Sequence, residues 1–285
     1  MEVIREAGAF SRLAESARMA GRAIGFVPTM GGLHEGHDAL IHRARDRGGF
    51  VAVSIFVNPT QFGPGEDLAR YPRDEAADLA RCEQLEVDAV WAPPVSEVYP
   101  PGVEAPSPDP GPVGDTFEGA SRPGHFRGVL MAVHRLLSVT GPTSAYFGEK
   151  DAQQLFLVRR MVTEQGLPAR IVACPTVRGA DGVARSSRNR SLTAEELEQA
   201  PSLFLGLSEA AAAARTGERS AAALIAAIAR EVGAATSARM DYVAVVDEAT
   251  FEPVTEVDGP ARAIVAARFS DTRLIDNLLL PSPAG

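Results

Sequence analysis

The sequence predicts an α/β fold with a parallel sheet covered by helices, because short apolar runs alternate with amphipathic stretches from about residue 23. The apolar runs are rich in β-branched or aromatic residues and are bounded by turn formers, which is typical of buried strands. They lie at residues 23–30, 50–58, 88–93, 144–149 and 169–177. Helical patterns lie at about 37–47, 67–86, 125–140 and 151–165. Ligands bind outside the carboxyl ends of such strands, so the residues that follow each strand are the site candidates.

The rest of the chain differs from this alternation. Residues 94–123 are rich in Pro and Gly and predict a long loop beside the site. After about residue 177 a polar loop leads into Ala-rich helices from 193 to 235, followed by strands near 241–247 and 261–269. We therefore expect a first domain at 1–176 and a smaller α+β domain at 177–285.

Composition excludes several classes of protein. The net charge of −9 disfavours DNA or RNA as a general partner, so an anionic ligand would need a local cluster of positive groups. No apolar run is long enough to span a membrane, and the N-terminus carries charges where a secretory signal needs an apolar core. We expect a cytoplasmic protein. Cys82 and Cys174 lack CxxC spacing and are predicted to be buried, unreactive thiols.

The first strand is followed by the turn PTMGGLHEGH at 28–37. Its paired glycines permit close backbone approach, and a helix predicted to begin near Asp38 offers free N–H groups and a positive dipole end to phosphate. His34 and His37 are three residues apart, so both lie on one face of the first turn and can stabilise charge at a phosphorus. The alternative is a capped helix with two surface histidines. A zinc site is disfavoured because HEGH lacks the HExxH spacing and a third ligand.

Only one of the 28 lysine and arginine residues is a lysine, Lys150. Lys150 follows the run at 144–149, at the mouth of the predicted sheet and beside a helix N-terminus. A lysine between Glu149 and Asp151 could form an exposed salt bridge, which would contribute little to folding stability. Because Lys is a compact point charge and Arg a broad planar fork, the position and uniqueness of this lysine favour a contact to phosphate.

Two further groups of polar residues follow predicted strands. Gln61, in the segment NPTQF, and Gln154, after Lys150, offer amides that suit hydroxyl and carboxylate groups, although loop glutamines are usually only solvated. The segment 185–188 has two adjacent hydroxyls followed by a guanidinium, which suits a triphosphate, but the tetrapeptide alone is a weak signal.

The combination of these segments is more specific than any one of them. An HxGH turn after the first strand resembles the nucleotidyltransferase superfamily that includes class I tRNA synthetases. The segments PTMGGLHEGH, FVNPTQFGPGEDLARYPR, RPGHFRGV, YFGEKDAQQ and DGVARSSRN, occurring in this order, resemble the pantothenate synthetase (pantoate–β-alanine ligase) family. The resemblance covers about residues 23–280 and includes RLIDN at 273–277.

The resemblance implies a Rossmann-like domain with helices on both faces of its sheet, a smaller C-terminal domain that contributes the SSR loop, and a homodimer. It implies that the carboxylate of pantoate attacks the α-phosphorus of ATP, giving pantoyl adenylate and pyrophosphate. The amine of β-alanine then displaces AMP and forms pantothenate. The family also uses Mg²⁺, which would neutralise the leaving pyrophosphate.

The resemblance also implies roles for individual residues. The implied ATP contacts are Met30, Gly31, Gly32, Leu33, His34, Glu35, Gly36, His37, Gly148, Glu149, Lys150, Asp151, Val177, Arg185, Ser186, Ser187 and Arg188. The residues expected to act in catalysis are His34, His37, Lys150, Ser186, Ser187 and Arg188. His37 would be the proton donor, Gln61 would contact pantoate and β-alanine, and Gln154 would contact pantoate. Asp78 is expected near the metal.

The sequence departs from the family pattern at several positions. Arg185 stands where an aliphatic residue is usual, and Gly179 replaces an acidic residue. Met131 and Ala132 stand where Thr and Val are typical, in a helix that shapes the acid pocket of the family. Because a missing methylene changes discrimination by roughly 1–3 kcal/mol, these changes affect the expected fit to pantoate more than the reaction class. Residues 94–123 or 178–190 are expected to close over the adenylate and exclude water.

Two other functions are compatible with parts of the sequence. An adenylyltransferase that acts on a phosphate-bearing nucleotide would share the HxGH turn, but it gives no reason for the glutamines of NPTQF and KDAQQ. A non-catalytic nucleotide sensor or partner-binding module would not need the complete set of histidine, lysine, serine and arginine side chains.

Overall fold

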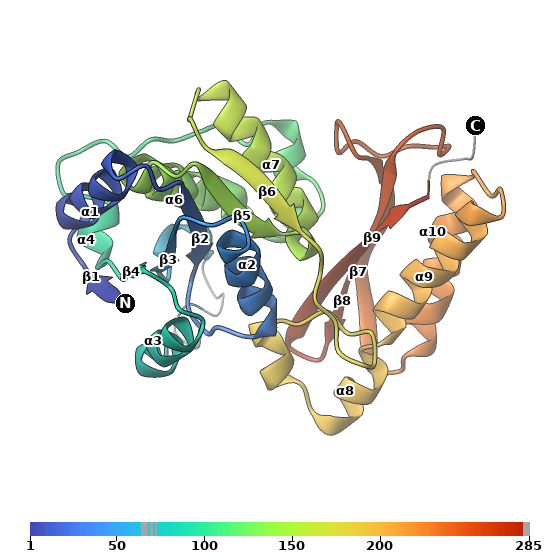
Figure 1. Ribbon diagram of the computed structural model, residues 1–285. Coiled ribbons are helices and arrows are strands. Elements are labelled where there is room, and N and C mark those ends of the chain that lie inside the picture. The colour runs from blue at the N-terminus through green and yellow to red at the C-terminus, as the bar shows by residue number, and fades with distance from the viewer. Residues whose placement is uncertain (64–67, 69–70, 72, 282–285) are drawn as a thin grey trace. The chain divides into compact units, whose positions relative to one another are not determined.

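The computed structural model describes residues 1–63, 68, 71 and 73–281. By its internal contacts the chain forms two compact units. The first comprises Met1–Glu149 and Gln153–Pro175, and the second comprises Lys150–Ala152 and Thr176–Gly285. Figure 1 shows a helix-covered sheet in the first and long strands with two packed helices in the second. The predicted fold class, a Rossmann-like parallel sheet with a smaller α+β part, is confirmed.

The sheet of the first unit is parallel throughout and has the strand order β1-β4-β3-β2-β5-β6. Its strands are β1 (Glu2–Ile4), β2 (Ile24–Thr29), β3 (Phe50–Ile55), β4 (Ala89–Trp91), β5 (Ser144–Gly148) and β6 (Arg170–Cys174). Its α-helices are α1 (Ala7–Met19), α2 (Glu35–Arg45), α3 (Glu75–Gln84), α4 (Val95–Val98), α5 (Glu118–Ser121), α6 (His125–Thr140) and α7 (Ala152–Glu164). Short 3-10 turns lie at η1 (Pro59–Gln61), η3 (Pro112–Asp115) and η4 (Glu149–Asp151).

The second unit has an antiparallel sheet of the order β7-β8-β9. Its strands are β7 (Ala238–Asp247), β8 (Ala261–Phe269) and β9 (Thr272–Leu280). Its helical segments are η5 (Ser187–Ser191), α8 (Ala194–Gln199), α9 (Ser202–Arg215) and α10 (Ala221–Ala234). Leu207 on α9, Leu224 and Ile228 on α10 and Val265 on β8 are fully buried in one cluster, so these helices cover a sheet face.

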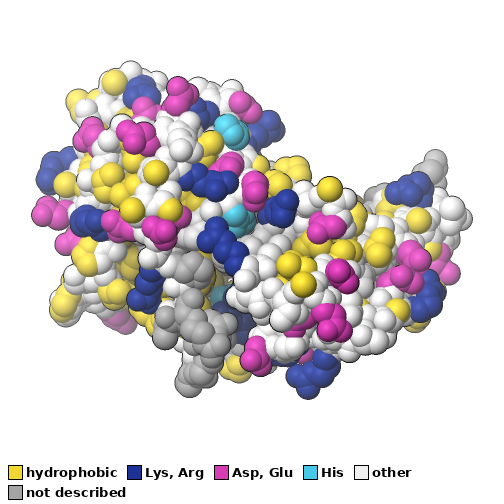
Figure 2. Space-filling model, turned by 90° about the horizontal axis from the view of Figure 1, so that it is seen from below, with side chains coloured by type: hydrophobic (Ala, Val, Ile, Leu, Met, Phe, Trp, Pro, Cys, Tyr) yellow, Lys and Arg dark blue, Asp and Glu magenta, His cyan; other side chains and the backbone are white. Residues whose placement is uncertain are grey.

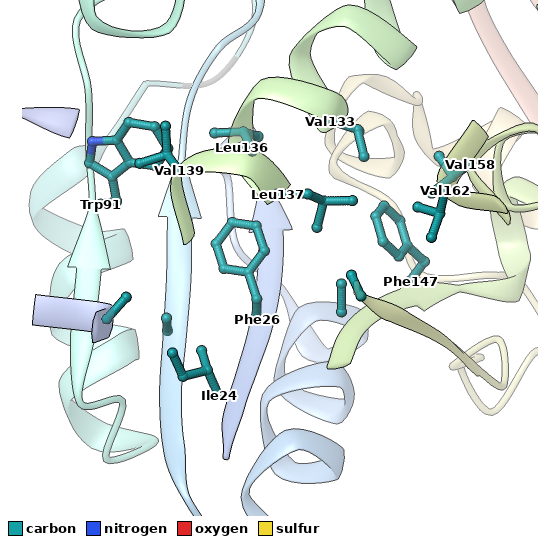
Figure 3. Packing of buried hydrophobic residues seen from close by; sticks show 14 of the residues in the cluster. Ile24, Phe26, Trp91, Val133, Leu136, Leu137, Val139, Phe147, Val158 and Val162 are labelled. Carbon is teal, nitrogen blue, oxygen red and sulfur yellow. The ribbon is translucent and has the colours of Figure 1, made fainter. Parts of the chain in front are cut away.

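Helices cover both faces of the parallel sheet because alternate residues of each strand point to opposite sides. Phe26 of β2 belongs to a buried cluster with residues of α1, α6 and α7, and the close-up shows it beside Leu136 and Leu137 of α6 (Figure 3). Its neighbour Val27 packs on the other face with Ile41 of α2 and Cys82 of α3. Burial on both faces explains why the strands read as continuous apolar runs in the sequence.

The strand predictions at 23–30, 50–58, 88–93, 144–149 and 169–177 are confirmed, each with one to three residues trimmed from one or both ends. The helix predicted at 125–140 has the predicted bounds, and Gly141 ends it in the left-handed conformation with φ 53°. The helix predicted to begin near Asp38 begins at Glu35 instead, because His34 caps it.

Other predictions were wrong in part. The helix predicted at 67–86 spans only Glu75–Gln84, since the Asp74 carboxylate caps it by accepting the N–H of Ala77 at 3.0 Å; residues 67, 69, 70 and 72 lie outside the described part. The loop predicted at 94–123 contains α4, η3 and α5. Elements β1, α1 and β9 were not predicted.

Both cysteines are buried, as predicted. Burial raises the pKa of the Cys82 thiol to about 12 and that of Cys174 to about 11. The thiolate is the reactive form of cysteine, so these side chains are inert in the folded protein.

The surface carries charges of both signs. On the face shown in Figure 2, Lys and Arg side chains lie among Asp and Glu side chains instead of forming one broad basic area. In the described part of the chain, every helix is too short or too polar to cross a membrane.

The substitution Phe26→Ala tests the core on the α6 face of the sheet. Phe26 is fully buried, so its loss leaves a cavity and should lower the free energy of unfolding by about 3–5 kcal/mol. Trp91, the one tryptophan of the chain, lies in the same cluster, so its fluorescence during urea unfolding reports this unit. Met19→Ala, at a side chain that is 81% exposed, should change stability by less than about 0.5 kcal/mol. Equal unfolding midpoints for the two variants would contradict this description of the core.

Candidate functional site

The backbone conformation of the turn after β2 is fixed by a buried carboxylate from α3. Asp78, 5% exposed, accepts the backbone N–H of Gly32 at 2.9 Å and that of Leu33 at 2.8 Å, one on each carboxylate oxygen. Gly31 and Gly32 have φ of 81° and 64°, a conformation that glycine adopts without strain. A Cβ atom at Gly31 would lie 2.8 Å from Asp78 Oδ2, so a side chain there would also displace the carboxylate.

The two histidines of this turn are oriented by backbone N–H groups. His34 Nδ1 accepts the N–H of Gly36 at 3.1 Å, and His37 Nδ1 accepts the N–H of His34 at 3.2 Å. The ring centroids are 4.2 Å apart. Because Nδ1 of each neutral ring is an acceptor, the ring proton of each lies on Nε2. The predicted pairing of His34 and His37 on one face of the first turn is therefore confirmed, with His34 as the cap.

An ion pair fixes α2 against α3. Arg81 Nε and Nη2 donate to the two carboxylate oxygens of Asp38 at 2.6 and 2.7 Å. The hydrogen bond to Asp38 raises the pKa of Arg81 above its ordinary value. Bidentate pairs of this kind have a defined geometry, so the start of α2, with its histidines, has a fixed place beside the helix that carries Asp78.

Asn58 organises the segment that carries Gln61. Its side chain, in a residue only 1% exposed, donates to Gln61 Oε1 at 3.0 Å and to the carbonyl of Gly128 at 3.0 Å. Its Oδ1 accepts the hydroxyls of Thr60 at 2.8 Å and Tyr99 at 2.9 Å. Since Gln61 Oε1 is an acceptor in this network, the amide orientation of Gln61 is fixed and its nitrogen is the donor group.

The backbone of Gln61 is held by the RPGHFRGV segment. His125, 8% exposed, places Nδ1 2.9 Å from the Gln61 carbonyl and Nε2 3.1 Å from Arg122 Nη1. A carbonyl only accepts and a guanidinium only donates, so the neutral ring carries its proton on Nδ1. At Gly128 a Cβ atom would lie 2.1 Å from the Thr60 carbonyl oxygen, so α6 contacts the 59–61 turn directly.

Sequence reasoning missed the positioning roles of Asn58, Tyr99, Arg122 and His125. The signal was present for three of them, because NPTQF contains Asn58 and RPGHFRGV contains Arg122 and His125. Tyr99 lies in the stretch that was predicted to be a loop, and no pattern in the sequence connects it to Asn58.

The two neighbouring glutamines of α7 have different surroundings. Gln153 is 5% exposed and donates to the carbonyls of Val113 at 2.7 Å and Thr116 at 3.0 Å, while it accepts the N–H of Glu118 at 3.1 Å. It therefore fixes the segment around η3 and α5. Gln154, the predicted pantoate contact, follows it and is half-buried.

The second unit holds Lys150 and the SSR segment. The Lys150 side chain is 16% exposed, with Nζ 3.7 Å from Asp151 Oδ1, so it is not the exposed salt bridge considered as an alternative. Residues 177–185 form a hairpin in which Arg185 N–H donates to the Val177 carbonyl at 2.9 Å. Ser186 follows the hairpin and caps η5 by accepting the N–H of Arg188 at 3.3 Å.

The four residues that depart from the family pattern differ in their burial and in the side chains around them. A Cβ atom at Gly179 would lie 2.4 Å from Asp181 Oδ1 and 3.4 Å from the Arg185 guanidinium carbon, so a larger residue would require Asp181 to move. Arg185 itself is exposed. Ala132 is buried against Phe56 in a small apolar cluster, while Met131 is half-buried on α6.

Comparisons with known proteins agree on one family. The family model described as Pantoate-beta-alanine ligase matches residues 2–279. A pantothenate synthetase of Rhizorhabdus wittichii is 49% identical over 284 residues, which cover 99% of this chain and 100% of the relative. One of Roseiflexus castenholzii is 48% identical over 280 residues, covering 98% and 99%.

The chain belongs to the pantoate-beta-alanine ligase family.

Solved structures of the family match over nearly the whole chain. The pantothenate synthetase of Thermus thermophilus superposes with a TM-score of 0.92 at 43% identity, covering 99% of this chain and 100% of that one. The pantoate-beta-alanine ligase of Francisella tularensis, solved in complex with beta-gamma ATP and beta-alanine, gives a TM-score of 0.79 at 32% identity, covering 99% of each. The resemblance inferred from the five segments is therefore confirmed, and it extends to residue 2.

The described residues do not form a protein cage for the Mg²⁺ that the family implies. No group of three or more His, Cys, Asp or Glu side chains suited to a metal occurs among them. Asp78, the predicted metal contact, has both oxygens engaged by backbone N–H groups. Mg²⁺ is usually bound through substrate phosphates, water and one or two carboxylates. A role of Asp78 at the metal stays a prediction, and its contacts give it a positioning role.

The predicted site residues thus fall into three groups. These are the turn 30–37 with Asp78, the glutamines Gln61 and Gln154, and the residues at and after the ends of β5 and β6. The first unit brings together the turn 30–37 and Asp78, and it holds Gln61 in the Asn58 network. Gln154 lies on α7 of the same unit. Residues 150–151, Val177 and 185–188 belong to the second unit, whereas Gly148, the last residue of β5, and Glu149, the first of η4, belong to the first. The convergence of the three groups on one nucleotide stays a prediction.

The substitution Asp78→Asn separates a positioning role from a metal role. The new amide keeps the shape but turns an N–H donor toward a backbone N–H, so we expect a loss of about 1–3 kcal/mol in unfolding free energy and lower activity. The Mg²⁺ concentration that gives half-maximal activity should stay unchanged. Asp74→Asn, on the same helix, is the control, because asparagine caps helices as well as aspartate. A large rise in the Mg²⁺ requirement of Asp78→Asn would instead favour a metal contact.

Proposed function

We propose that the chain joins pantoate and β-alanine to form pantothenate, with cleavage of ATP to AMP and pyrophosphate through a pantoyl adenylate. The observation that carries this proposal is the turn 30–37, in which two imidazoles present Nε2 protons beside a glycine-rich start of a helix. Membership of the pantoate-beta-alanine ligase family supports the same reaction.

The first step joins two anions, so its barrier depends on positive groups at the phosphates. The carboxylate oxygen of pantoate forms a bond to the α-phosphorus, and the bond from that phosphorus to the pyrophosphate oxygen breaks. Nε2–H donors on His34 and His37 suit the negative charge that develops on the phosphoryl oxygens, and fixed donors need no reorganisation during the reaction. His37 is the proposed proton donor. Lys150 and Arg188 supply full positive charges.

The proposed nucleotide contacts come from four segments of the chain. They are residues 30–37, 148–151, 177 and 185–188. The start of α2 offers the positive end of the helix dipole to phosphate. Ser186 and Ser187 offer hydroxyls beside the Arg188 guanidinium. Mg²⁺ is proposed to enter bound to the ATP phosphates, where it would balance the charge of pyrophosphate.

Gln61 and Gln154 are the proposed contacts to the acid. Asn58 fixes Gln61 so that its amide nitrogen is the donor, which suits a carboxylate or hydroxyl oxygen of pantoate and then the carboxylate of β-alanine. In the second step the neutral amine attacks the acyl carbon of the adenylate and AMP leaves. Holding the reacting groups together can lower the barrier by about 7–11 kcal/mol in favourable cases.

Several features of the whole protein belong to the same proposal. Residues 1–176 would bind ATP and pantoate, and residues 177–285 would contribute the SSR loop.

Closure by 94–123 or 178–190 would exclude water, since an acyl adenylate hydrolyses readily. Unchanged hydrogen exchange in both segments after addition of ATP and pantoate would contradict closure. The protein is proposed to be a cytoplasmic homodimer, and light scattering at several concentrations measures its assembly.

Isotope exchange between pyrophosphate and ATP tests the reaction. We expect exchange only when pantoate is present, because pyrophosphate can re-form ATP only from the adenylate. AMP should accumulate only after β-alanine is added. Exchange without pantoate, or with a nucleotide in its place, would indicate an adenylyltransferase. Binding of ATP with no exchange under any condition would indicate a nucleotide sensor.

Single-turnover adenylate formation tests the charged groups. Lys150→Ala and His37→Ala should each lower the rate by about tenfold or more, since each removes a donor to the phosphates. Thermal unfolding checks that both variants fold, because Lys150→Ala removes a side chain that is 16% exposed and His37→Ala removes the acceptor of the His34 N–H. Arg190→Ala, at an exposed position in η5, is the control and should keep the parent rate. A normal rate for either variant removes the proposed role of that residue.

A further inference from the structure

Two consecutive residues of β9 contact the segments that carry Lys150 and the SSR loop. Asp276 and Asn277 are both 4% exposed. Asn277 Nδ2 donates to the backbone carbonyl of Lys150 at 2.8 Å. These contacts lie within the second unit, to which the segment Lys150–Ala152 belongs, although the residues on either side of this segment, Glu149 and Gln153, belong to the first.

The side chain of Asn277 is itself held by an ion pair that is partly buried. Arg262 on β8, 4% exposed, donates from Nη1 to Asn277 Oδ1 at 2.5 Å. Its Nε and Nη2 donate to the two carboxylate oxygens of Glu248 at 2.8 and 2.9 Å. An arginine held in this way can only donate, so Asn277 must direct its oxygen to Arg262 and its nitrogen to Lys150. The chain of contacts Glu248–Arg262–Asn277 thus ends on the peptide of Lys150.

Asp276 holds the hairpin that precedes the SSR segment. Its carboxylate accepts two hydrogen bonds from Arg178, at 2.6 and 2.9 Å. Arg178 also donates to the carbonyls of Gly182 at 3.0 Å and Asn277 at 3.3 Å, and its guanidinium lies 4.0 Å from the centre of the Phe204 ring. The 177–185 hairpin leads directly into Ser186. The contacts between the hairpin and β9 therefore determine the position of the Ser186 and Ser187 hydroxyls.

We propose that Asp276 and Asn277 are positioning residues of the adenylation step, with Asn277 fixing Lys150 and Asp276 fixing the SSR segment. This inference rests on the proposed function, in which both segments contact ATP. A lysine side chain has four carbons between its backbone and its charge, so a small rotation of the peptide displaces the ammonium. Since the two residues are adjacent on a strand paired with β8 along its length, both segments share one rigid support.

The substitution Asn277→Asp tests the contact to Lys150. Aspartate keeps the shape and the oxygen that Arg262 contacts, but it replaces the N–H donor with an oxygen that repels the Lys150 carbonyl. We expect adenylate formation in a single turnover to fall by about tenfold. Gln199→Glu is the matched control, because it makes the same amide-to-carboxylate change elsewhere in this unit, on contacts to Thr236 and Ser237. The control should retain the parent rate.

A double-mutant cycle with Lys150→Ala distinguishes positioning from general stability. If Asn277 acts through Lys150, Asn277→Asp should lower the rate of the Lys150→Ala protein by less than about twofold. Asp276→Asn should still lower the rate in that background, because it acts through Arg178. An equal loss from Asn277→Asp in both backgrounds would overturn the inference.

The outcomes separate this inference from the proposed function. A slow Lys150→Ala protein with a fully active Asn277→Asp protein overturns the inference alone. A fully active Lys150→Ala protein overturns both. Thermal unfolding measures whether each variant folds. If the Asn277→Asp protein does not fold, Asn277→Ser takes its place in the same cycle. The serine hydroxyl is too short to reach the Lys150 carbonyl, so this variant also removes the contact. An active Asn277→Ser protein would overturn the inference as well.

Discussion

The carboxylate of Asp78 is the interaction on which the geometry of the first turn depends. It accepts two consecutive backbone N–H groups and is buried, so the turn after β2 has one conformation instead of many. That conformation requires positive φ at Gly31 and Gly32, and it places His34 where it can cap α2. Hydrogen bonds from backbone N–H groups to a charged acceptor are stronger than those to a neutral acceptor. The site is thus built on a helix far along the chain from the turn that it shapes.

The histidines illustrate how backbone contacts select chemistry. His34 and His37 accept at Nδ1 and therefore carry Nε2 protons, whereas His125 donates from Nδ1 to a carbonyl and accepts from Arg122 at Nε2. The neutral imidazole thus carries its proton on Nε2 in the turn 30–37 and on Nδ1 at position 125. Residue type alone does not distinguish these roles, because the identity of the partner decides which nitrogen is protonated.

Much of the first unit could be predicted because its strands are buried on both faces and stand out as apolar runs. Helix α1 was not predicted, although its buried residues Ala7, Phe10, Ala14 and Ala17 lie at helical spacing, because it precedes the alternation of apolar runs that begins near residue 23. The turn with His34 was readable from its glycines and spacing. The supports were not: Asp78 and Asn58 act through backbone groups and amides that are distant in sequence, and such contacts leave no local pattern.

Gly128 shows how the site restricts the core. A glycine inside a helix lowers stability by roughly 0.5–1 kcal/mol relative to alanine, and α6 carries one at the point where it meets the Thr60 carbonyl. Any methyl group there would push the two main chains apart and carry Gln61 with them. The usual route to a more stable helix, exchanging glycine for alanine, is therefore closed at this position. A more stable variant of this protein has to be sought through substitutions on helices whose backbones do not contact the 59–61 turn.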